Sequence, residues 1–169
     1  MTLQLGSIGQ RRTGNMRLID RKLIDGVIAT ARTSPRKRQN YNFHQHSDAL
    51  QRFLNAMEPG TYFCPHRHLQ ASKTETFVVL CGRIGIVQFT EEGRIISTAI
   101  AKPGGDVFGV DLDPTDWHTL VVLEPGTVIL ECKAGPYIAD TAKDFAPWAP
   151  KEGSAEAVET LLKWEQLFT

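Results

Sequence analysis

Two histidines one residue apart, His66 and His68, have the residue type and spacing best suited to chemistry. Side chains of a strand alternate between its two faces, so both imidazoles would point the same way, with Cα atoms about 6.6 Å apart. Glu75 begins the next apolar run, and we expect a hairpin to bring its carboxylate to the same point. His118 opens a later run, which closure of a barrel would bring alongside.

Three imidazoles and one carboxylate form a mixed nitrogen and oxygen ligand set. Such a set suits one divalent transition metal (Fe, Mn, Ni, Zn or Cu) and differs from the thiolate-rich sites of structural zinc. It leaves coordination positions open, so the metal would act as a Lewis acid or, if it is iron, as an oxygen-activating centre. The alternative is that these are ordinary surface or core histidines. For an isolated His-x-His pair that alternative would be favoured, because such a pair occurs by chance.

A second group of residues has the chemistry to bind an anionic small molecule. Guanidinium groups recognise carboxylates and phosphates through paired hydrogen bonds, so an acidic metabolite or a sugar phosphate would be the ligand. The candidate binding residues are Arg36, Arg38, Asn42, Arg52, Arg67 and Lys133. The alternative is a solvated charged loop, because exposed arginine and lysine are common.

His44 and Tyr137 are the candidates for a general base, if the chemistry needs one. His44 and His46 form a second His-x-His pair, but no carboxylate follows on a nearby strand, so we predict that this pair does not bind metal. His44 could still line a ligand pocket. Tyr137 could offer its hydroxyl to a ligand or simply pack its ring. Cys64 would lie on the same face of the strand as His66 and His68, and we expect it to be a small residue of the core.

The part of the chain that positions these residues is predicted to be all β. Short runs rich in Val, Ile, Phe and Thr alternate with clusters of Gly, Pro and Asp, which indicates strands. We expect strands near residues 51–57, 61–68, 75–81, 83–89, 94–101, 106–112, 117–123 and 127–133. Eight short strands at this spacing indicate a sandwich or a small barrel.

One helix is predicted at each end of the strand region. Apolar residues from Leu18 to Ala31 recur at helical spacing, with Asp20 as the N-cap and Pro35 as the stop. Ser154 would cap a second helix. We expect one apolar side of that helix to pack against the barrel or a second subunit, and that side comprises Val158, Leu161, Leu162, Trp164 and Phe168.

The composition describes one globular domain. The 169 residues are 41% hydrophobic and carry 19 basic and 19 acidic side chains, which argues against nucleic-acid binding by bulk charge. No run of 18 apolar residues is present to span a membrane. Three cysteines without a pairing pattern and the lack of a signal-like N-terminus favour a reduced, cytoplasmic protein. Residues 1–15 are predicted to be a poorly ordered extension of a single domain at 16–169.

The spacing around the histidines resembles the two cupin motifs. The first motif is matched by Gly60, His66, Arg67, His68, Glu75 and Gly82, and the second by residues 103–118. The resemblance implies a cupin-type β-barrel, that is, a double-stranded β-helix or jelly roll, with a metal held by the three histidines and Glu75. Six residues separate His68 from Glu75 where the usual motif has three or four, so whether Glu75 is a ligand stays open.

A narrower resemblance extends from Met16 to about Glu152. Its segments are 34–38 (SPRKR), 51–56 (QRFLNA), 65–68 (PHRH), 75–80 (ETFVVL), 117–119 (WHT), 132–137 (CKAGPY) and 145–150 (FAPWAP). Together they resemble the WbuC-type cupin metalloproteins. This resemblance implies a single-domain bacterial cupin from a family that occurs in surface-polysaccharide gene clusters and has no assigned reaction.

Three functions fit these observations. One is a metal-dependent isomerase, epimerase or oxygenase that acts on a small anionic oxygenated metabolite or sugar derivative. Another is a non-catalytic ligand-binding or metal-binding module with a structural metal, and the third is a metal-free isomerase with a histidine base. The fold does not decide among them. We expect a homodimer, because cupin barrels leave strand edges and a sheet face that pair subunits.

Overall fold

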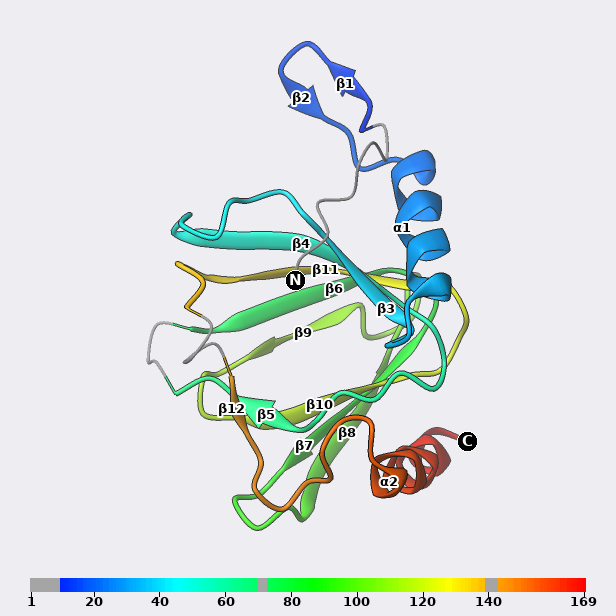
Figure 1. Cartoon of the computed structure of the whole chain (residues 1–169), viewed down its shortest axis with the longest axis vertical. Coiled ribbons are helices and arrows are strands. Elements are labelled where there is room, and N and C mark those ends of the chain that lie inside the picture. Colours follow the sequence, from blue (N-terminus) through cyan, green and yellow to red (C-terminus); the bar gives the residue numbers. More distant parts are fainter. Residues whose placement is uncertain (1–9, 70–72, 139–142) are drawn as a thin grey trace.

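The computed structural model describes residues 10–69, 73–138 and 143–169, and its strands form two antiparallel five-stranded sheets that face each other (Figure 1). Sheet I has the order β3-β4-β11-β6-β9, formed by Arg38–Asn42, Leu50–Met57, Thr127–Ala134, Glu75–Cys81 and Gly109–Leu112. Sheet II has the order β12-β5-β10-β7-β8, formed by Asp144–Phe145, His66–Arg67, Trp117–Val122, Ile84–Phe89 and Ile95–Ala101.

The path of the chain through β4–β11 is that of a jelly roll. Four of these strands lie in each sheet, in the orders β4-β11-β6-β9 and β5-β10-β7-β8. Apart from the β7–β8 hairpin, every connection between consecutive strands leads from one sheet to the other. This is the jelly-roll topology of the cupin-type β-barrel, so the predicted fold class is confirmed.

Most strand predictions are confirmed to within a few residues, with two differences. The predicted strand at 61–68 is reduced to His66–Arg67, and that at 106–112 to Gly109–Leu112. Sequence analysis also missed β3 and β12, which lie at one edge of each sheet. Both are polar or very short, so neither shows the run of β-branched and aromatic residues by which a strand is recognised.

Each helix covers the outer face of one sheet. The first, α1 (Arg21–Thr33), is capped by Asp20, whose carboxylate accepts the Leu23 backbone N–H at 3.0 Å. It packs its buried side on sheet I, against a group that includes Leu54 and Val128. Figure 1 shows α1 beside sheet I and α2 beside sheet II.

The second helix, α2 (Ala155–Glu165), begins after Ser154 as predicted and is followed by a single 3₁₀ turn, η2 (Gln166–Phe168). Its predicted apolar side is only partly buried. Leu161 and Trp164 pack on sheet II, whereas the side chains of Val158 and Leu162 are exposed. The helix therefore covers the sheet with a narrower stripe than the sequence indicates.

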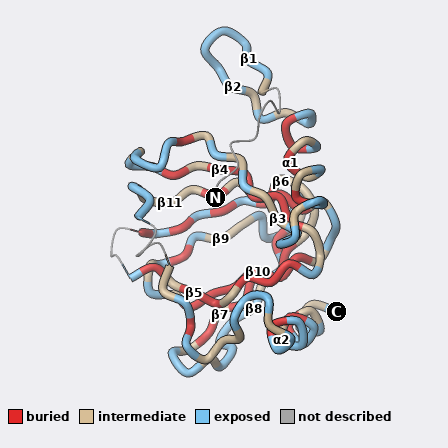
Figure 2. The backbone as a smooth tube through the Cα atoms, viewed as in Figure 1, coloured by how far each residue is buried: buried red, intermediate tan, exposed pale blue. Residues whose placement is uncertain are grey.

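The predicted extension falls partly outside the described residues, which begin at residue 10. Within its described part, β1 (Arg12–Thr13) pairs with β2 (Met16–Arg17) in a short antiparallel hairpin. Figure 2 shows that this hairpin is exposed and that the buried residues concentrate in the two sheets.

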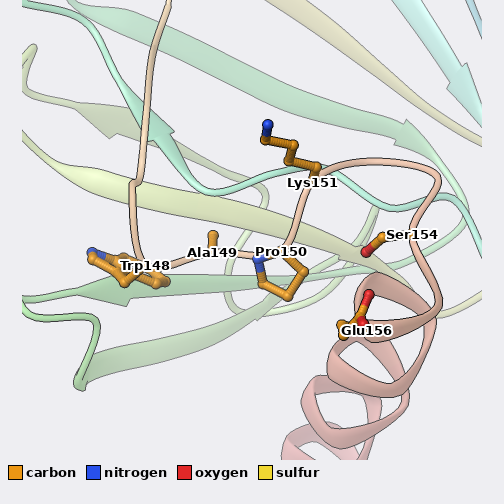
Figure 3. Close-up of a pocket in the computed structure, with 6 residues that line it drawn as sticks. All are labelled: Trp148, Ala149, Pro150, Lys151, Ser154 and Glu156. Atoms are coloured by element: carbon orange, nitrogen blue, oxygen red, sulfur yellow. The ribbon is translucent and has the colours of Figure 1, made fainter.

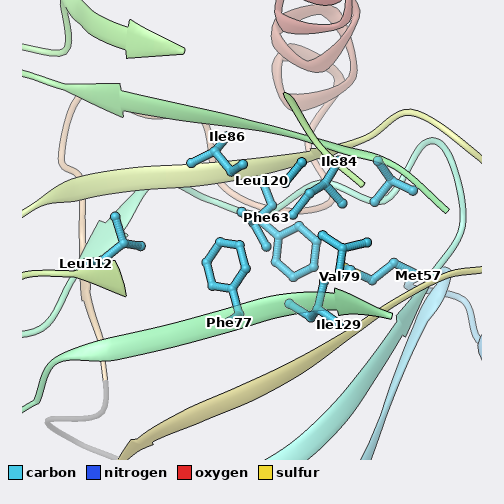
Figure 4. Close-up of a cluster of buried hydrophobic side chains, with 11 residues drawn as sticks. Met57, Phe63, Phe77, Val79, Ile84, Ile86, Leu112, Leu120 and Ile129 are labelled. Atoms are coloured by element: carbon cyan, nitrogen blue, oxygen red, sulfur yellow. The ribbon is translucent and has the colours of Figure 1, made fainter. Parts of the chain in front are cut away.

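The interior between the sheets is apolar at one end and polar at the other. The apolar end is a cluster of eleven buried side chains that includes Phe77, Ile84, Leu120 and Ile129 (Figure 4). Along β11 the same inward face continues from Ile129 to Glu131 and Lys133, because alternate residues of a strand share a face. The candidate site lies at the polar end.

Phe77 is expected to anchor the apolar end. Its side chain is only 2% exposed, so Phe77→Ala should lower the free energy of unfolding by about 3–5 kcal/mol through lost burial and the cavity left behind. Urea unfolding followed by circular dichroism measures this. Phe108→Ala is the matched control, since Phe108 is exposed and should change stability by no more than about 0.5 kcal/mol. Equal effects of the two substitutions would contradict this account of the core.

Candidate metal centre and adjacent cavity

His66, His68, Glu75 and His118 form one buried group, called here the His–Glu cluster. Within sheet II, His118 of β10 lies directly opposite His66 of β5. Glu75 begins β6 in sheet I, so the predicted hairpin between His68 and Glu75 is wrong. The chain crosses from one sheet to the other between these residues, and the carboxylate meets the imidazoles across the interior.

The donor atoms of the His–Glu cluster converge on a small volume. One nitrogen from each histidine and one carboxylate oxygen all lie within 4.8 Å of one another. Glu75 Oε2 lies 2.8 Å from His68 Nε2 and 3.4 Å from His118 Nε2. The ring centroids of His66 and His118 are 4.5 Å apart. Glu75, which the long spacing left open as a ligand, therefore lies among the histidines.

Backbone carbonyls orient two of the three imidazoles. His66 Nδ1 lies 3.1 Å from the Cys64 carbonyl oxygen, and His118 Nδ1 lies 2.8 Å from that of Asp116. A carbonyl accepts only from a protonated nitrogen, so each Nδ1 carries a hydrogen and each Nε2 is left to face the other members of the cluster. A metal-ligating histidine is held by its other nitrogen in the same way.

The Nε2 atom of His66 is the strongest indication that the His–Glu cluster binds a metal ion. This nitrogen is buried and makes no hydrogen bond in the structure. Burial, followed by the charges of Lys143 and His118, lowers the pKa of His66 well below its ordinary value, so the ring is neutral. A neutral, buried and unpartnered imidazole nitrogen beside a carboxylate fits a metal ion, and the His–Glu cluster could hold one.

A buried ion network supports Glu75 from the side away from the histidines. Lys133 Nζ lies 3.5 Å from Glu75 Oε1 and 2.7 Å from Glu131 Oε1. Burial alone would raise the pKa of Glu75, but Lys133, Glu131 and the two nearby histidines lower it well below its ordinary range. Burial and the charge of Glu75 raise the pKa of Glu131 to about 8. At neutral pH, therefore, Glu75 carries the negative charge and Glu131 is protonated.

A cavity of about 590 Å³ lies near the His–Glu cluster, although none of the four cluster residues lines it. It is within the size range of small-molecule sites, which is about 300–1,000 Å³. Two lining residues connect the cavity with the cluster. Lys133 contacts Glu75. The ring centroid of Phe145 lies 6.2 Å from that of His66. The lining residues are Ser34, Arg36, Arg38, Gln39, Asn40, Asn42, His44, His46, Gln51, Phe53, Asn55, Phe63, Cys64, Glu131, Lys133, Tyr137, Lys143, Phe145 and Glu152.

Four of the predicted ligand-binding residues line this cavity, namely Arg36, Arg38, Asn42 and Lys133. The two residues named as possible bases, His44 and Tyr137, line it as well. His44 Nδ1 lies 2.8 Å from the backbone nitrogen of Arg52, which holds the ring in place. Cys64 borders the cavity and packs against the apolar group under α2, and burial raises the pKa of its thiol.

Arg52 and Arg67 are not among the lining residues. Arg52 alternates along β4 with Gln51 and Phe53, which face the cavity, so its side chain belongs to the opposite face. Arg67 lies between the two metal-site histidines and also faces away. Its guanidinium bonds Asp144 at 2.9 Å and stacks 4.3 Å over the Trp117 ring. The structure therefore makes Arg67 a support for β5, β10 and β12.

The two arginines that line the cavity are already paired. Glu152 accepts from Arg36 at 2.7 and 2.8 Å and from Arg38 at 2.9 Å. Arg38 also donates to Thr61 Oγ1 and to the Tyr62 carbonyl, at 3.0 and 2.8 Å. These contacts join the segment before α2 to the start of β3.

We expect Glu152→Gln to remove a small acid-sensitive part of the stability. Burial alone would raise the pKa of Glu152, but Arg36 and Arg38 outweigh it and lower the pKa. A carboxylate with a lowered folded-state pKa stabilises the fold above its unfolded pKa, and this contribution is lost as the pH falls through the folded pKa. The Arg36 side chain is 61% exposed, so the loss at pH 7 should be only about 0.5–1 kcal/mol.

Urea unfolding at neutral and acidic pH measures this difference. Wild type and Glu152→Gln should differ at pH 7 and converge as the pH falls. Glu159→Gln, at an exposed position of α2, is the control and should follow the wild type throughout. A constant difference at all pH values would show that the ion pairs do not contribute.

Sequence analysis missed several residues of the cavity. Glu131 alternates with Lys133 on β11, and this strand parity was an available signal. The amides of Gln51 and Asn55 on β4 could have been found in the same way. Lys143 precedes the very short β12 and shows no sequence signal of its position.

A second, smaller depression lies at the start of α2 (Figure 3). It has a volume of about 390 Å³ and is lined by Trp148, Ala149, Pro150, Lys151, Ser154 and Glu156. The Ser154 hydroxyl already accepts the Ala157 backbone N–H at 3.2 Å, which caps the helix. The residues of the His–Glu cluster line neither pocket, but Lys133 of the larger cavity contacts Glu75, so the larger cavity is the candidate ligand site.

Comparison with known proteins gives weak similarities. A family model described as a domain of unknown function (DUF6016) matches residues 19–101. No curated protein sequence matches this chain. Separately, no described helix has the length and apolarity needed to cross a bilayer.

Similar solved structures include an oxalate decarboxylase of Lactobacillus farciminis in a formate complex (15% identity, TM-score 0.47), KdgF of a Halomonas species (18%, 0.48) and an oxalate decarboxylase of Bacillus subtilis (15%, 0.48). Each similarity covers 64% of this chain, and they cover 30%, 87% and 27% of those chains, respectively. The chain thus spans less than a third of the two oxalate decarboxylases. At TM-scores below 0.5, these similarities support no conclusion about ligand or reaction.

Proposed function

We propose that this protein is a metal-dependent enzyme that isomerises, epimerises or oxygenates a small anionic, oxygen-rich molecule, such as a sugar derivative. One observation carries the proposal: a cavity rich in cationic and amide side chains adjoins the buried His–Glu cluster through Lys133. A ligand in this cavity would lie beside the coordination positions that four protein donors leave open.

His66, His68 and His118, together with Glu75, would hold one divalent transition metal. When bound, the metal would supply Lewis acidity, or oxygen activation if it is iron. The chain supplies the rest. Lys133 and the protonated Glu131 keep Glu75 charged, and the cavity amides of Asn42, Gln51 and Asn55 are suited to bind hydroxyl groups.

His44 and Tyr137 remain the candidates for proton transfer, because both line the cavity. The proposal also includes membership of the WbuC-type cupins. The jelly-roll topology supports this membership. So does the position of two of the matching segments, Pro-His-Arg-His at 65–68 and Trp-His-Thr at 117–119, whose histidines lie on adjacent strands.

Cobalt substitution tests the proposal without a known substrate. We expect the visible spectrum of cobalt-loaded protein to change saturably when glycolate is added, because a carboxylate and a hydroxyl together can occupy open positions. The competing function is a binding module with a structural metal. That function predicts an unchanged spectrum together with unfolding when a chelator removes the metal. Activity that survives chelators would instead support the metal-free isomerase.

A further inference from the structure

Among the described residues, four cationic side chains line the cavity, and three of them already form ion pairs. Arg36 and Arg38 share Glu152 at 2.7 and 2.9 Å. Lys133 is held by Glu131 at 2.7 Å and by Glu75 at 3.5 Å. These three side chains shape the cavity, and each already has a carboxyl partner within the protein.

Lys143 is the fourth cation, and it differs from the others. Within residues 10–69, 73–138 and 143–169, no carboxylate lies within ion-pair distance of its ammonium group, and no hydrogen bond to it is formed. The residue is half-buried. A half-buried ammonium group with no carboxylate in direct contact is unfavourable, and a bound anion would relieve the cost.

The position of Lys143 places this charge beside the metal site. It immediately precedes β12, whose Phe145 is paired with His66 across the sheet. After burial, the charge of Lys143 is the largest influence that lowers the pKa of His66. Burial and the charge of Lys133 in turn lower the pKa of Lys143 to about 8, so the group still carries its charge at neutral pH.

We propose that Lys143 binds the anionic group of the ligand in the cavity and so directs the ligand's other oxygen atoms toward the His–Glu cluster. The inference rests on the proposed function, because it places the same ligand in the same cavity. It assigns the ligand's carboxylate or phosphate to a residue that the sequence did not indicate. Arg36 and Arg38, which the sequence favoured for this role, instead hold Glu152.

Paired probes separate the contribution of Lys143 from that of the metal. Glycolate and ethylene glycol can each chelate a metal through two oxygen atoms, but only glycolate carries a charge. Cobalt-loaded protein is titrated with each, and the visible spectrum gives the dissociation constants. In Lys143→Met we expect glycolate to bind about tenfold or more weakly, which is the effect of losing one charge-assisted hydrogen bond, while ethylene glycol binding is unchanged.

Two further variants serve as controls. Lys143→Arg keeps the charge and should retain most of the preference for glycolate. Lys151→Met removes a lysine that borders only the smaller depression and should behave as the wild type. Metal content, measured for every variant, should be unchanged. Loss of cobalt in Lys143→Met would overturn the inference, since it would show that Lys143 serves the metal site itself.

The inference and the proposed function fail in different ways. If the wild-type spectrum does not respond to glycolate, the proposed function fails. If the wild type responds and Lys143→Met binds glycolate with the same dissociation constant, the proposed function stands and the role of Lys143 is refuted. An equal loss of both probes in Lys143→Met would also refute it, because a general distortion of the cavity would then explain the effect.

Discussion

Replacing His66 by alanine is expected to abolish metal binding, whereas replacing His46 by alanine should leave it unchanged. Both residues belong to a His-x-His pair, but only His66 is part of the His–Glu cluster. Its Nε2 is buried without a partner beside Glu75. Loss of residues that merely orient ligands costs about 10–100-fold in metal affinity, so loss of a ligand should cost more than about 100-fold.

Inductively coupled plasma mass spectrometry of tag-free protein measures this result. Wild type, His66→Ala, His118→Ala and His46→Ala are purified identically. We expect about one transition metal per chain in wild type and His46→Ala, and none in His66→Ala and His118→Ala. Equal metal in wild type and His66→Ala would refute the His–Glu cluster as the site. A wild type that binds no metal, even after reconstitution with Fe, Mn, Ni and Zn, would refute the metalloprotein itself.

Replacing Lys133 by methionine should strongly destabilise the metal-free protein. Lys133 is the cation that contacts both buried carboxylates, Glu75 and Glu131. Removing it leaves the charge of Glu75 buried without that partner, and breaking a buried pair from one side costs about 3–5 kcal/mol. The Glu131 carboxyl adds little to this cost, because its raised pKa of about 8 keeps it protonated at neutral pH.

A double-variant cycle measures the effect. Urea unfolding of chelator-treated protein is compared for Lys133→Met, Glu75→Gln and the two together. We expect the double variant to recover most of the stability lost in Lys133→Met, since neither charge then remains. Lys102→Met, at an exposed position, is the control and should change stability little. Additive losses in the double variant would show that the two side chains are not coupled.

Helix starts and most strands were predictable from local sequence. Asp20 and Ser154 cap α1 and α2 as expected, because a capping side chain bonds a backbone N–H only a few residues away. Strands such as β6 and β10 were found from runs of β-branched and aromatic residues. The two edge strands, β3 and β12, were missed because one is polar and the other has only two residues.

Strand alternation along β4 and β5 decides which arginines face the cavity. Arg52 lies between Gln51 and Phe53 on β4, and Arg67 lies between His66 and His68, so neither faces the cavity. Both were chosen for their charge and not for the face that they occupy. The same rule would have placed Glu131 inward with Lys133.

The sequence by itself determined the residue types of the candidate site and the fold class: three histidines and a carboxylate at spacings that suit a transition metal, on a chain patterned for a small β-barrel. Only the tertiary structure decided how Glu75 reaches the histidines, because the crossing from sheet II to sheet I depends on sheet pairing across long sequence separations. It also decided which cations form ion pairs. Glu152 pairs with Arg36, which is 116 residues away in the chain, and leaves Lys143 as the charge without a partner among the described residues that line the cavity. Residue types specify what a side chain can bind, whereas its partners are set by contacts that form only when distant segments pack together.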